Sequence, residues 1–235
     1  MSLILRVDID KPYGTSNIIK RIASKLVENY WFPIFDSFGY LRHVEKFISF
    51  CNSQNIHGIF YHRQCTAPNK KIKDILIQSG HKIGFHAENT INIDSFSNEL
   101  SCFKTKTNLQ NIESFTKHGS GMLRLGKHHY PVYEPEKYLE WSLKLGIGFY
   151  FGNGTCKSGE DLLAQNNFSA NMFWIEREYR NPGFFELQKL LDVAKDNDVV
   201  VLIHPCNYCS SKVVSDDFKQ LVKLSKDQNI SWKII

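Results

Sequence analysis

Carboxylate and imidazole side chains recur in this chain directly after short apolar runs. Asp8 and Asp10 end the first run and are two residues apart, so their side chains share one face of an extended strand. His86 ends the run HKIGFH, and His204 ends VVVLIH before a proline. A buried pair of aspartates is costly unless a cation or hydrogen-bond donors offset its charge. The pattern therefore favours a metal site over a set of unrelated loop residues.

The types of side chain narrow the choice of metal. One carboxylate oxygen with two imidazole nitrogens suits Zn²⁺, Co²⁺, Fe²⁺ or Mn²⁺ and leaves positions open for water and a substrate. Further polar residues at strand ends are His128 and His129, after a predicted strand around Leu123, and Asn153, after GIGFYFG. Taken singly, each of these is more often a hydrogen-bonding loop residue than a ligand.

Short apolar runs that alternate with amphipathic stretches predict repeated βα units. The run DVVVLIHP is continuously apolar and β-branched, as in strands that are buried on both faces of a parallel sheet. About seven strands predict one closed or nearly closed α/β barrel over residues 1–235, with an open doubly wound sheet as the alternative. The expected strands are 3–7, 58–61, 82–85, 122–125, 148–151, 199–203 and 231–235. The expected helices are 17–28, 41–52, 70–78, 95–116 (continuous or broken), 135–145, 184–195 and 216–227.

Catalytic groups of parallel α/β barrels collect just beyond the C-terminal ends of the strands. The acidic and imidazole residues above occupy that position on four separate predicted strands, which predicts a common site. No GxGxxG follows the first strand, so the sequence gives little support for dinucleotide binding.

Composition and charge argue against a nucleic-acid-binding, a membrane-spanning or a secreted protein. The net charge of +5 comes from lysines spread along the chain, which indicates an ordinary solvated surface, although it is compatible with anionic substrates such as nucleotide-linked or acidic sugars. No nucleic-acid module is present. The sequence contains no uninterrupted run of about 18 apolar residues, so it predicts no transmembrane helix. The opening MSLILRVDID lacks the basic flank and the long apolar run of a signal peptide. We therefore expect a cytoplasmic protein without membrane insertion.

The six cysteines, at positions 51, 65, 102, 156, 206 and 209, show no repeated spacing, so free and mostly buried thiols are expected. Cys206 and Cys209 form a CxxC. Without a second pair, this motif is poor evidence for a zinc or redox site.

Three motifs resemble those of the polysaccharide deacetylase superfamily, also called the NodB-homology or carbohydrate esterase family four. They are the aspartate pair in RVDID, the strand in SGHKIGFHAEN and the strand in VVVLIHP. The resemblance implies a distorted (β/α)7-type barrel. It also implies that Asp8 is the catalytic base, that Asp10 and His86 bind the metal, and that His204 is the general acid.

The usual second motif carries another ligand histidine four residues further on, where this chain has Thr90. A divergent branch has instead a histidine–tyrosine pair after the fourth strand, and KHHYPVYEPEKYLEWSLKLGIGFY is similar to that arrangement. The resemblance thus implies His129 as the third ligand, with His128 as the fallback. The opening LRVDIDKPYG further resembles the WbmS-like branch, whose members are associated with bacterial surface-polysaccharide clusters.

Other polar residues have less specific assignments. The resemblance implies Arg124 as the counterpart of the third-motif arginine that orients the base, although the RxPYG context of that motif is absent. Glu88 and Glu176 either orient a ligand or lie at the surface, and the surface is the favoured interpretation. Asn153 is a candidate for substrate binding.

The resemblance implies a metal-dependent hydrolase, with Zn²⁺ as the first choice of metal. It would remove an acetyl or related acyl group from an amide on a carbohydrate or nucleotide-sugar, in the biosynthesis of O-antigen or lipopolysaccharide. The protein could also form a homo-oligomer. The main alternative is a catalytically impaired carbohydrate-binding or scaffold protein, because of Thr90. Further alternatives are hydrolysis of another amide, such as a cyclic one, and a thiol-redox or structural-zinc role for the CxxC.

Overall fold

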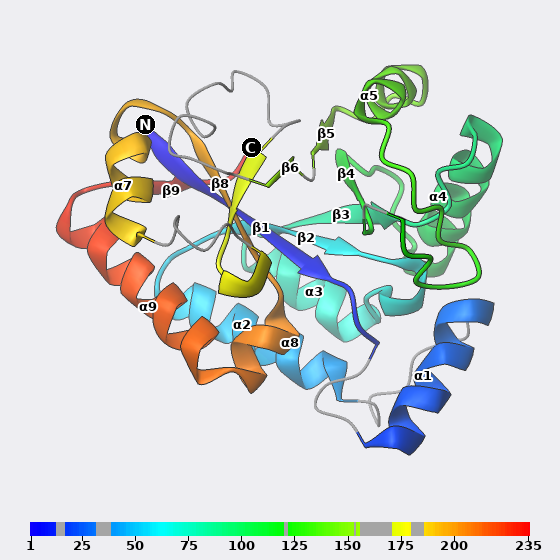
Figure 1. Ribbon diagram of the computed structural model, residues 1–235, viewed down its shortest axis with the longest axis horizontal. Helices are drawn as coiled ribbons and strands as arrows, with labels where there is room; N and C mark the ends of the chain where they lie inside the picture. Colours follow the sequence, from blue (N-terminus) through cyan, green and yellow to red (C-terminus); the bar gives the residue numbers. More distant parts are fainter. Residues whose placement is uncertain (13–16, 32–38, 120–121, 153, 156–170, 180–185) are drawn as a thin grey trace.

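The computed structural model describes residues 1–12, 17–31, 39–119, 122–152, 154–155, 171–179 and 186–235. A curled parallel sheet runs through the molecule, and helices cover its outer side (Figure 1). The strands are β1 (Ser2–Ile9), β2 (Gly58–His62), β3 (Lys82–Ala87), β4 (Ser114–Lys117), β5 (Phe149–Phe151), β6 (Gly154–Thr155), β7 (Asn171–Trp174), β8 (Val199–Ile203) and β9 (Ser231–Lys233). The helices are α1 (Ile18–Tyr30), α2 (Tyr40–Ser53), α3 (Lys70–Gln78), α4 (Ile93–Thr107), α5 (Pro135–Lys144), α7 (Leu187–Asp196), α8 (Pro205–Ser210) and α9 (Lys212–Asp227), with short 3₁₀ turns η2 (Gln64–Thr66) and η3 (Arg177–Tyr179).

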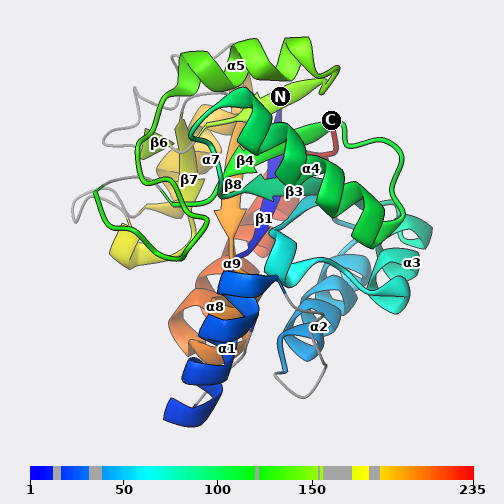
Figure 2. The same ribbon diagram turned by 90° about the vertical axis from the view of Figure 1, so that its right-hand side faces the viewer.

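The strand order is β5-β4-β3-β2-β1-β8-β7-β6, and β9 pairs with the start of β1. All these pairs are parallel. The chain passes from β5 to β6 within a few residues, so the two edges of the sheet lie next to each other (Figures 1 and 2). The pairings in the described part of the chain leave the barrel unclosed at this seam. The architecture confirms the distorted (β/α) barrel.

Alternation along β1 decides which side chains face the interior of the barrel. Leu3, Leu5 and Val7 pack in the outer core, whose helical side is formed by residues of α2, α3, α7 and α9. Ile4 belongs to a separate interior cluster with side chains of β2, β7 and β8. Because successive side chains of a strand point to opposite faces, Arg6 and Asp8 lie on the interior side with Ile4. The strand that begins the chain therefore delivers charged groups to the inside of the barrel.

The predicted fourth strand was wrong. Residues 122–125 form a loop in which Met122 is fully exposed, whereas β4 lies eight residues earlier. The predicted helix 95–116 also ran too long, because Asn108 adopts the left-handed conformation with φ 52° and ends α4. Phe115 of β4 is fully buried and pairs with Phe85 of β3, so burial and pairing mark the true strand.

No helix in these described ranges combines the length and apolar character that crossing a bilayer requires.

Candidate metal centre and active site

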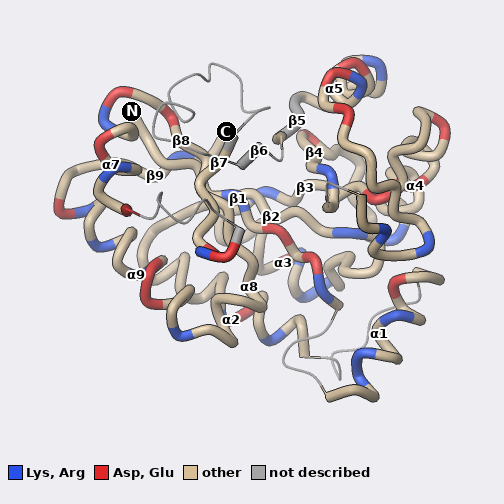
Figure 3. The backbone as a smooth tube through the Cα atoms, viewed as in Figure 1, with Lys and Arg blue, Asp and Glu red and all other residues tan. Residues whose placement is uncertain are grey.

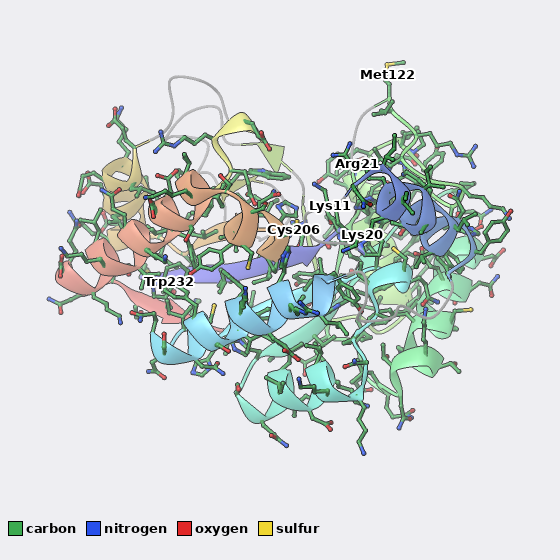
Figure 4. All side chains as sticks on the ribbon, turned by 90° about the horizontal axis from the view of Figure 1, so that it is seen from below. Lys11, Lys20, Arg21, Met122, Cys206 and Trp232 are labelled. Carbon is green, nitrogen blue, oxygen red and sulfur yellow. The ribbon has the colours of Figure 1, made fainter. Side chains whose placement is uncertain are left out.

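Four strand ends deliver ionisable side chains to one cavity of about 540 Å³. Asp10 follows β1, His86 lies in β3, His118 follows β4, and His204 follows β8. Each reaches the C-terminal edge of the sheet, where neighbouring parallel strands end together. In Figure 4, Lys11 and Cys206, which both line the cavity, lie close together beside the end of β1.

Asp10, His86 and His118 form a group that could hold a metal ion. Asp10 Oδ1 lies 2.8 Å from His86 Nε2 and 3.4 Å from His118 Nδ1. The two imidazole nitrogens are 3.2 Å apart. Ligand atoms about 2.1 Å from a tetrahedral metal lie about 3.4 Å from one another, so these spacings suit a common ion.

The surroundings of these three side chains also fit a cation. His86 Nδ1 hydrogen-bonds Thr116 Oγ1 of β4, which leaves Nε2 directed at Asp10. A hydrogen bond from the nitrogen that faces away from the metal fixes the ring orientation of a metal-binding histidine. Asp10 Oδ1 is buried and has no hydrogen-bond partner among the described residues, despite its short distance to His86. A buried carboxylate oxygen without a donor is destabilising, and a divalent transition metal would satisfy it.

His129, the third ligand implied by the family resemblance, lies outside this group. Its Nε2 is 2.8 Å from the carbonyl oxygen of His118, and its Nδ1 accepts from the backbone N–H of Leu125. Both ring nitrogens are therefore engaged by backbone, and His129 supports the segment that carries His118. The fallback residue His128 lies 2.8 Å from the carbonyl oxygen of Asn29 through its Nε2 and stacks on Trp31.

Asp8 is held by a buried arginine from its own strand. Arg6 donates from Nε to Asp8 Oδ1 at 2.9 Å and from Nη2 to Oδ2 at 2.6 Å. Burial raises the pKa of Asp8, but the charges of Arg6 and His86 and the hydrogen bonding to Arg6 together outweigh it, so the pKa lies below the usual 3.8. Asp8 is thus kept ionised, with Oδ2 3.8 Å from His86 Nε2.

Arg124, which was expected to orient the base, is exposed and donates to the carbonyls of Gly126 and Lys127. Its place beside Asp8 is taken by Arg6. The reason is the loop position of residues 122–125, which puts Arg124 on the surface rather than at the end of a strand.

His204 pairs with Glu176, which follows β7. Glu176 Oε1 accepts from the backbone N–H of His204 and lies 2.9 Å from its Nδ1. On the other side of the ring, Nε2 is 3.2 Å from Asp10 Oδ2. Burial lowers the pKa of His204, but the carboxylates of Glu176 and Asp10 outweigh it and raise the pKa well above 6.5. A protonated imidazole is therefore favoured here.

The expectation that Glu88 and Glu176 lie at the surface was wrong, since both are buried. Glu88 accepts from Arg63 Nε at 2.5 Å, and Arg63 Nη1 also donates to the carbonyl oxygen of Asp10. Arg63 therefore joins the ends of β1 and β3 directly behind the candidate ligands. Burial raises the pKa of Glu88, but Arg63, His118 and His86 together outweigh it and hold the pKa below 4.5. Asn153, the remaining candidate, lies outside the described residues.

The CxxC shows no sign of redox activation. Cys206 and Cys209 are free thiols, both in α8. Burial raises the pKa of each thiol, which disfavours the reactive thiolate. Free thiols are also found at Cys51, Cys65 and Cys102, as expected, while Cys156 lies outside the described residues.

Solved structures of polysaccharide deacetylases have the same architecture. A CE4 esterase from Streptococcus mutans is 14% identical, with a TM-score of 0.53, covering 99% of this chain and 86% of the other. A probable polysaccharide deacetylase from Pseudomonas aeruginosa PAO1 is 11% identical, with a TM-score of 0.53, covering 98% and 86%. The chain has the polysaccharide deacetylase fold. No family model and no curated protein matches the sequence, so the likeness is one of fold.

Within this deacetylase fold, sequence reasoning missed two residues of the site, Arg6 and His118. The sequence could have predicted the position of Arg6, because residues two apart on a strand share a face and Arg6 precedes Asp8 by two residues. The signal for His118 was its position directly after SFTK, which the predicted helix 95–116 obscured.

Proposed function

We propose that this chain is a metal-dependent hydrolase that removes an acetyl or related acyl group from an amide nitrogen on a sugar. The observation that carries the proposal is the convergence of Asp10, His86 and His118 from three strands on one point. An arginine-paired carboxylate, Asp8, and a glutamate-paired histidine, His204, flank that point. A base and an acid beside a metal group are the parts that amide hydrolysis requires.

The ligand set would be Asp10 Oδ1, His86 Nε2 and His118 Nδ1. When bound there, a divalent transition metal, with Zn²⁺ expected first, polarises the amide carbonyl and makes a water molecule more acidic. Asp8 Oδ2, the oxygen nearer His86, takes the proton of the attacking water. Arg6 keeps Asp8 ionised for this step.

His204 donates a proton to the departing amine nitrogen. Its charged form is favoured by Glu176, which holds Nδ1 so that Nε2 faces the cavity and Asp10. Glu176 thus acts as a positioning residue, because it contacts the acid and not the substrate. The proton taken up by Asp8 and the proton released by His204 balance the reaction, and the free acid and the amine are the products.

The walls of the cavity favour a sugar as the acyl carrier. Trp174, Leu123 and Leu125 provide an apolar lining above the polar floor. The indole of Trp174 lies near the ring of His204, with 5.8 Å between ring centroids, and offers a face for the apolar side of a pyranose. A carbohydrate or nucleotide-sugar of bacterial surface-polysaccharide biosynthesis would suit this cavity. The catalytic domain would span residues 1–235.

The alternative of a catalytically impaired member loses its main support. It rested on Thr90 in place of the usual second-motif histidine. Thr90 is buried and lies 3.3 Å from the hydroxyl of Tyr138, and His118 offers an imidazole to the group instead.

Metal analysis of purified variants tests the proposal. We expect the wild type to carry one transition metal per chain, and His118→Ala to lose it, because one of three protein ligands is gone. His129→Ala is the matched control and should retain the metal. Asp8→Asn should retain the metal while acetate release from N-acetylated sugars is lost. Full metal content in His118→Ala together with loss in His129→Ala would reject the assignment, and unchanged acetate release by Asp8→Asn would remove its role as base.

A further inference from the structure

Helix α1 exposes a predominantly apolar face. At 100° per residue, its five large, exposed apolar side chains fall within an arc of about 120°. Each is more than half exposed: Ile18, Ile19, Ile22, Leu26 and Tyr30. The buried residues of the helix, Ser24, Val27 and Glu28, lie outside this arc. We call these five side chains the α1 apolar face.

A loop extends this apolar face to the cavity. Met122 and Leu123 are strongly exposed, and Leu125 is partly exposed. Lys25 of α1 donates to the carbonyl oxygen of Leu125 at 2.9 Å, so helix and loop are in contact. Leu123 and Leu125 also line the candidate active-site cavity. Figure 4 shows Met122 projecting away from the body of the molecule, and Figure 2 shows α1 standing clear of the sheet. Exposed apolar surface of this kind marks an interaction site.

Cationic side chains border the apolar surface. Figure 3 shows basic residues along α1, and Figure 4 labels two of them, Lys20 and Arg21. Arg124 and Lys127 of the loop are exposed as well. Glu28, the acidic residue of α1, is buried, and its carboxylate pairs with Lys25 and Arg63. The exposed part of α1 and its loop is therefore apolar at the centre and positive at the edge.

We propose that α1 and residues 122–127 dock onto the surface of a bilayer that contains anionic lipids. The helix of 13 residues is about 20 Å long, which is too short to cross a hydrocarbon core of about 30 Å. An amphipathic helix with basic residues beside its apolar face lies in the plane of the interface instead. The lysines and arginines face the anionic headgroups, and the isoleucine and leucine side chains enter the acyl boundary.

A second copy of this chain fits the same surface less well. A two-fold interface brings the same patch of both subunits together, so the basic residues of one copy would face those of the other. A protein partner there would also cover Leu123 and Leu125 at the cavity. A bilayer matches the charge, and it can present an amphiphile to the cavity from the same side. If the proposed function holds, the substrate class would be a glycan carried on a lipid anchor. Docking itself does not depend on the proposed function.

Vesicle co-sedimentation of the full chain tests docking. We expect binding to phosphatidylcholine vesicles that contain phosphatidylglycerol and weaker binding to phosphatidylcholine alone. The double variant Ile22→Gln/Leu26→Gln should lower the partition coefficient about 30-fold, because two side chains no longer enter the bilayer. Arg21→Gln should lower it about fivefold on anionic vesicles only. Leu143→Gln, which changes an exposed leucine on α5, is the matched control and should bind as the wild type does.

Three outcomes would overturn docking: no sedimentation with anionic vesicles, binding that Ile22→Gln/Leu26→Gln leaves unchanged, and a wild-type dimer in sedimentation velocity that this variant dissociates. All substituted positions are exposed, so circular dichroism melting should show folded variants. Binding is measured without turnover, and hydrolysis of a soluble N-acetylated sugar is measured without vesicles. Failure of docking and failure of the proposed function are therefore distinguishable.

Discussion

Replacing Arg6 by methionine removes the buried cation that holds Asp8. Methionine keeps a long, unbranched side chain in the barrel interior but offers no charge and no hydrogen-bond donor. Both partners are almost completely buried, and two hydrogen bonds of 2.9 and 2.6 Å join them. A third donor of Arg6, Nη1, binds the carbonyl oxygen of Gly152 at 2.7 Å. The substitution therefore removes both hydrogen bonds that Arg6 donates to the Asp8 carboxylate and the one that it donates to the Gly152 carbonyl.

Breaking a buried pair by removing one member costs about 3–5 kcal/mol, because the remaining charge is uncompensated. The lost bond to Gly152 contributes about 1–2 kcal/mol of this cost. In Arg6→Met/Asp8→Asn the charge is gone and only the smaller part remains. We therefore expect the double variant to be about 2 kcal/mol more stable than Arg6→Met alone. Such changes are large against a typical unfolding free energy of about 5–15 kcal/mol.

Urea denaturation at pH 7 measures these differences. A chelator is present throughout, because a bound metal would stabilise the folded state of each variant to a different extent. Asp8→Asn alone completes the double-mutant cycle. If Arg6→Met/Asp8→Asn is as unstable as the sum of the two single variants, the charge of Asp8 is not what Arg6 compensates, and the argument for an arginine-held base fails.

Three further predictions concern the acid, the network behind the site and the cavity wall. Glu176→Gln keeps a hydrogen-bond acceptor for His204 but removes the charge that favours its imidazolium form. We therefore expect kcat to fall about 100-fold, while the metal content and KM stay unchanged. An unaltered kcat would contradict the positioning role of Glu176. Burial, followed by the charge of Glu88, raises the pKa of Glu99 to about 8 from 4.5, so its protonated form is favoured on folding. That contribution is complete below pH 4.5 and lost as the pH rises through 8, so the wild type should lose a few kcal/mol between pH 5 and 8 in urea titrations, whereas Glu99→Gln should show a shallower dependence. Trp174→Leu should raise KM about tenfold with little change in kcat, and an unchanged KM would argue against sugar stacking.

The order of the main strands could be predicted from the sequence because their signals are local. The runs that became β1, β3 and β8 are short, apolar and bounded by polar residues, and burial on both faces of a parallel sheet requires that composition. The fourth strand could not be placed in the same way. SFTK is short and mixed in polarity, whereas MLRL nearby, at residues 122–125, is richer in apolar residues but exposed. Hydrophobicity along the chain does not reveal which of two segments pairs with β3.

That single misplacement accounts for the main difference between the site residues predicted from the sequence and the candidate site in the structure. The rule that functional side chains follow strand ends selected Asp10, His86 and His204, and all three line the same cavity. Applied to the true end of β4, it selects His118; applied to residues 122–125, it selected His128 and His129. The strand-end rule, applied to the predicted strands, does not select Arg6 or Glu176. Arg6 reaches the site because it lies two residues before Asp8 on the same face of β1. Glu176 reaches it because β7, which it follows, pairs with β8, which His204 follows. A site of this kind can be predicted from sequence only as far as its strands can, since each ligand inherits its position from the strand that carries it.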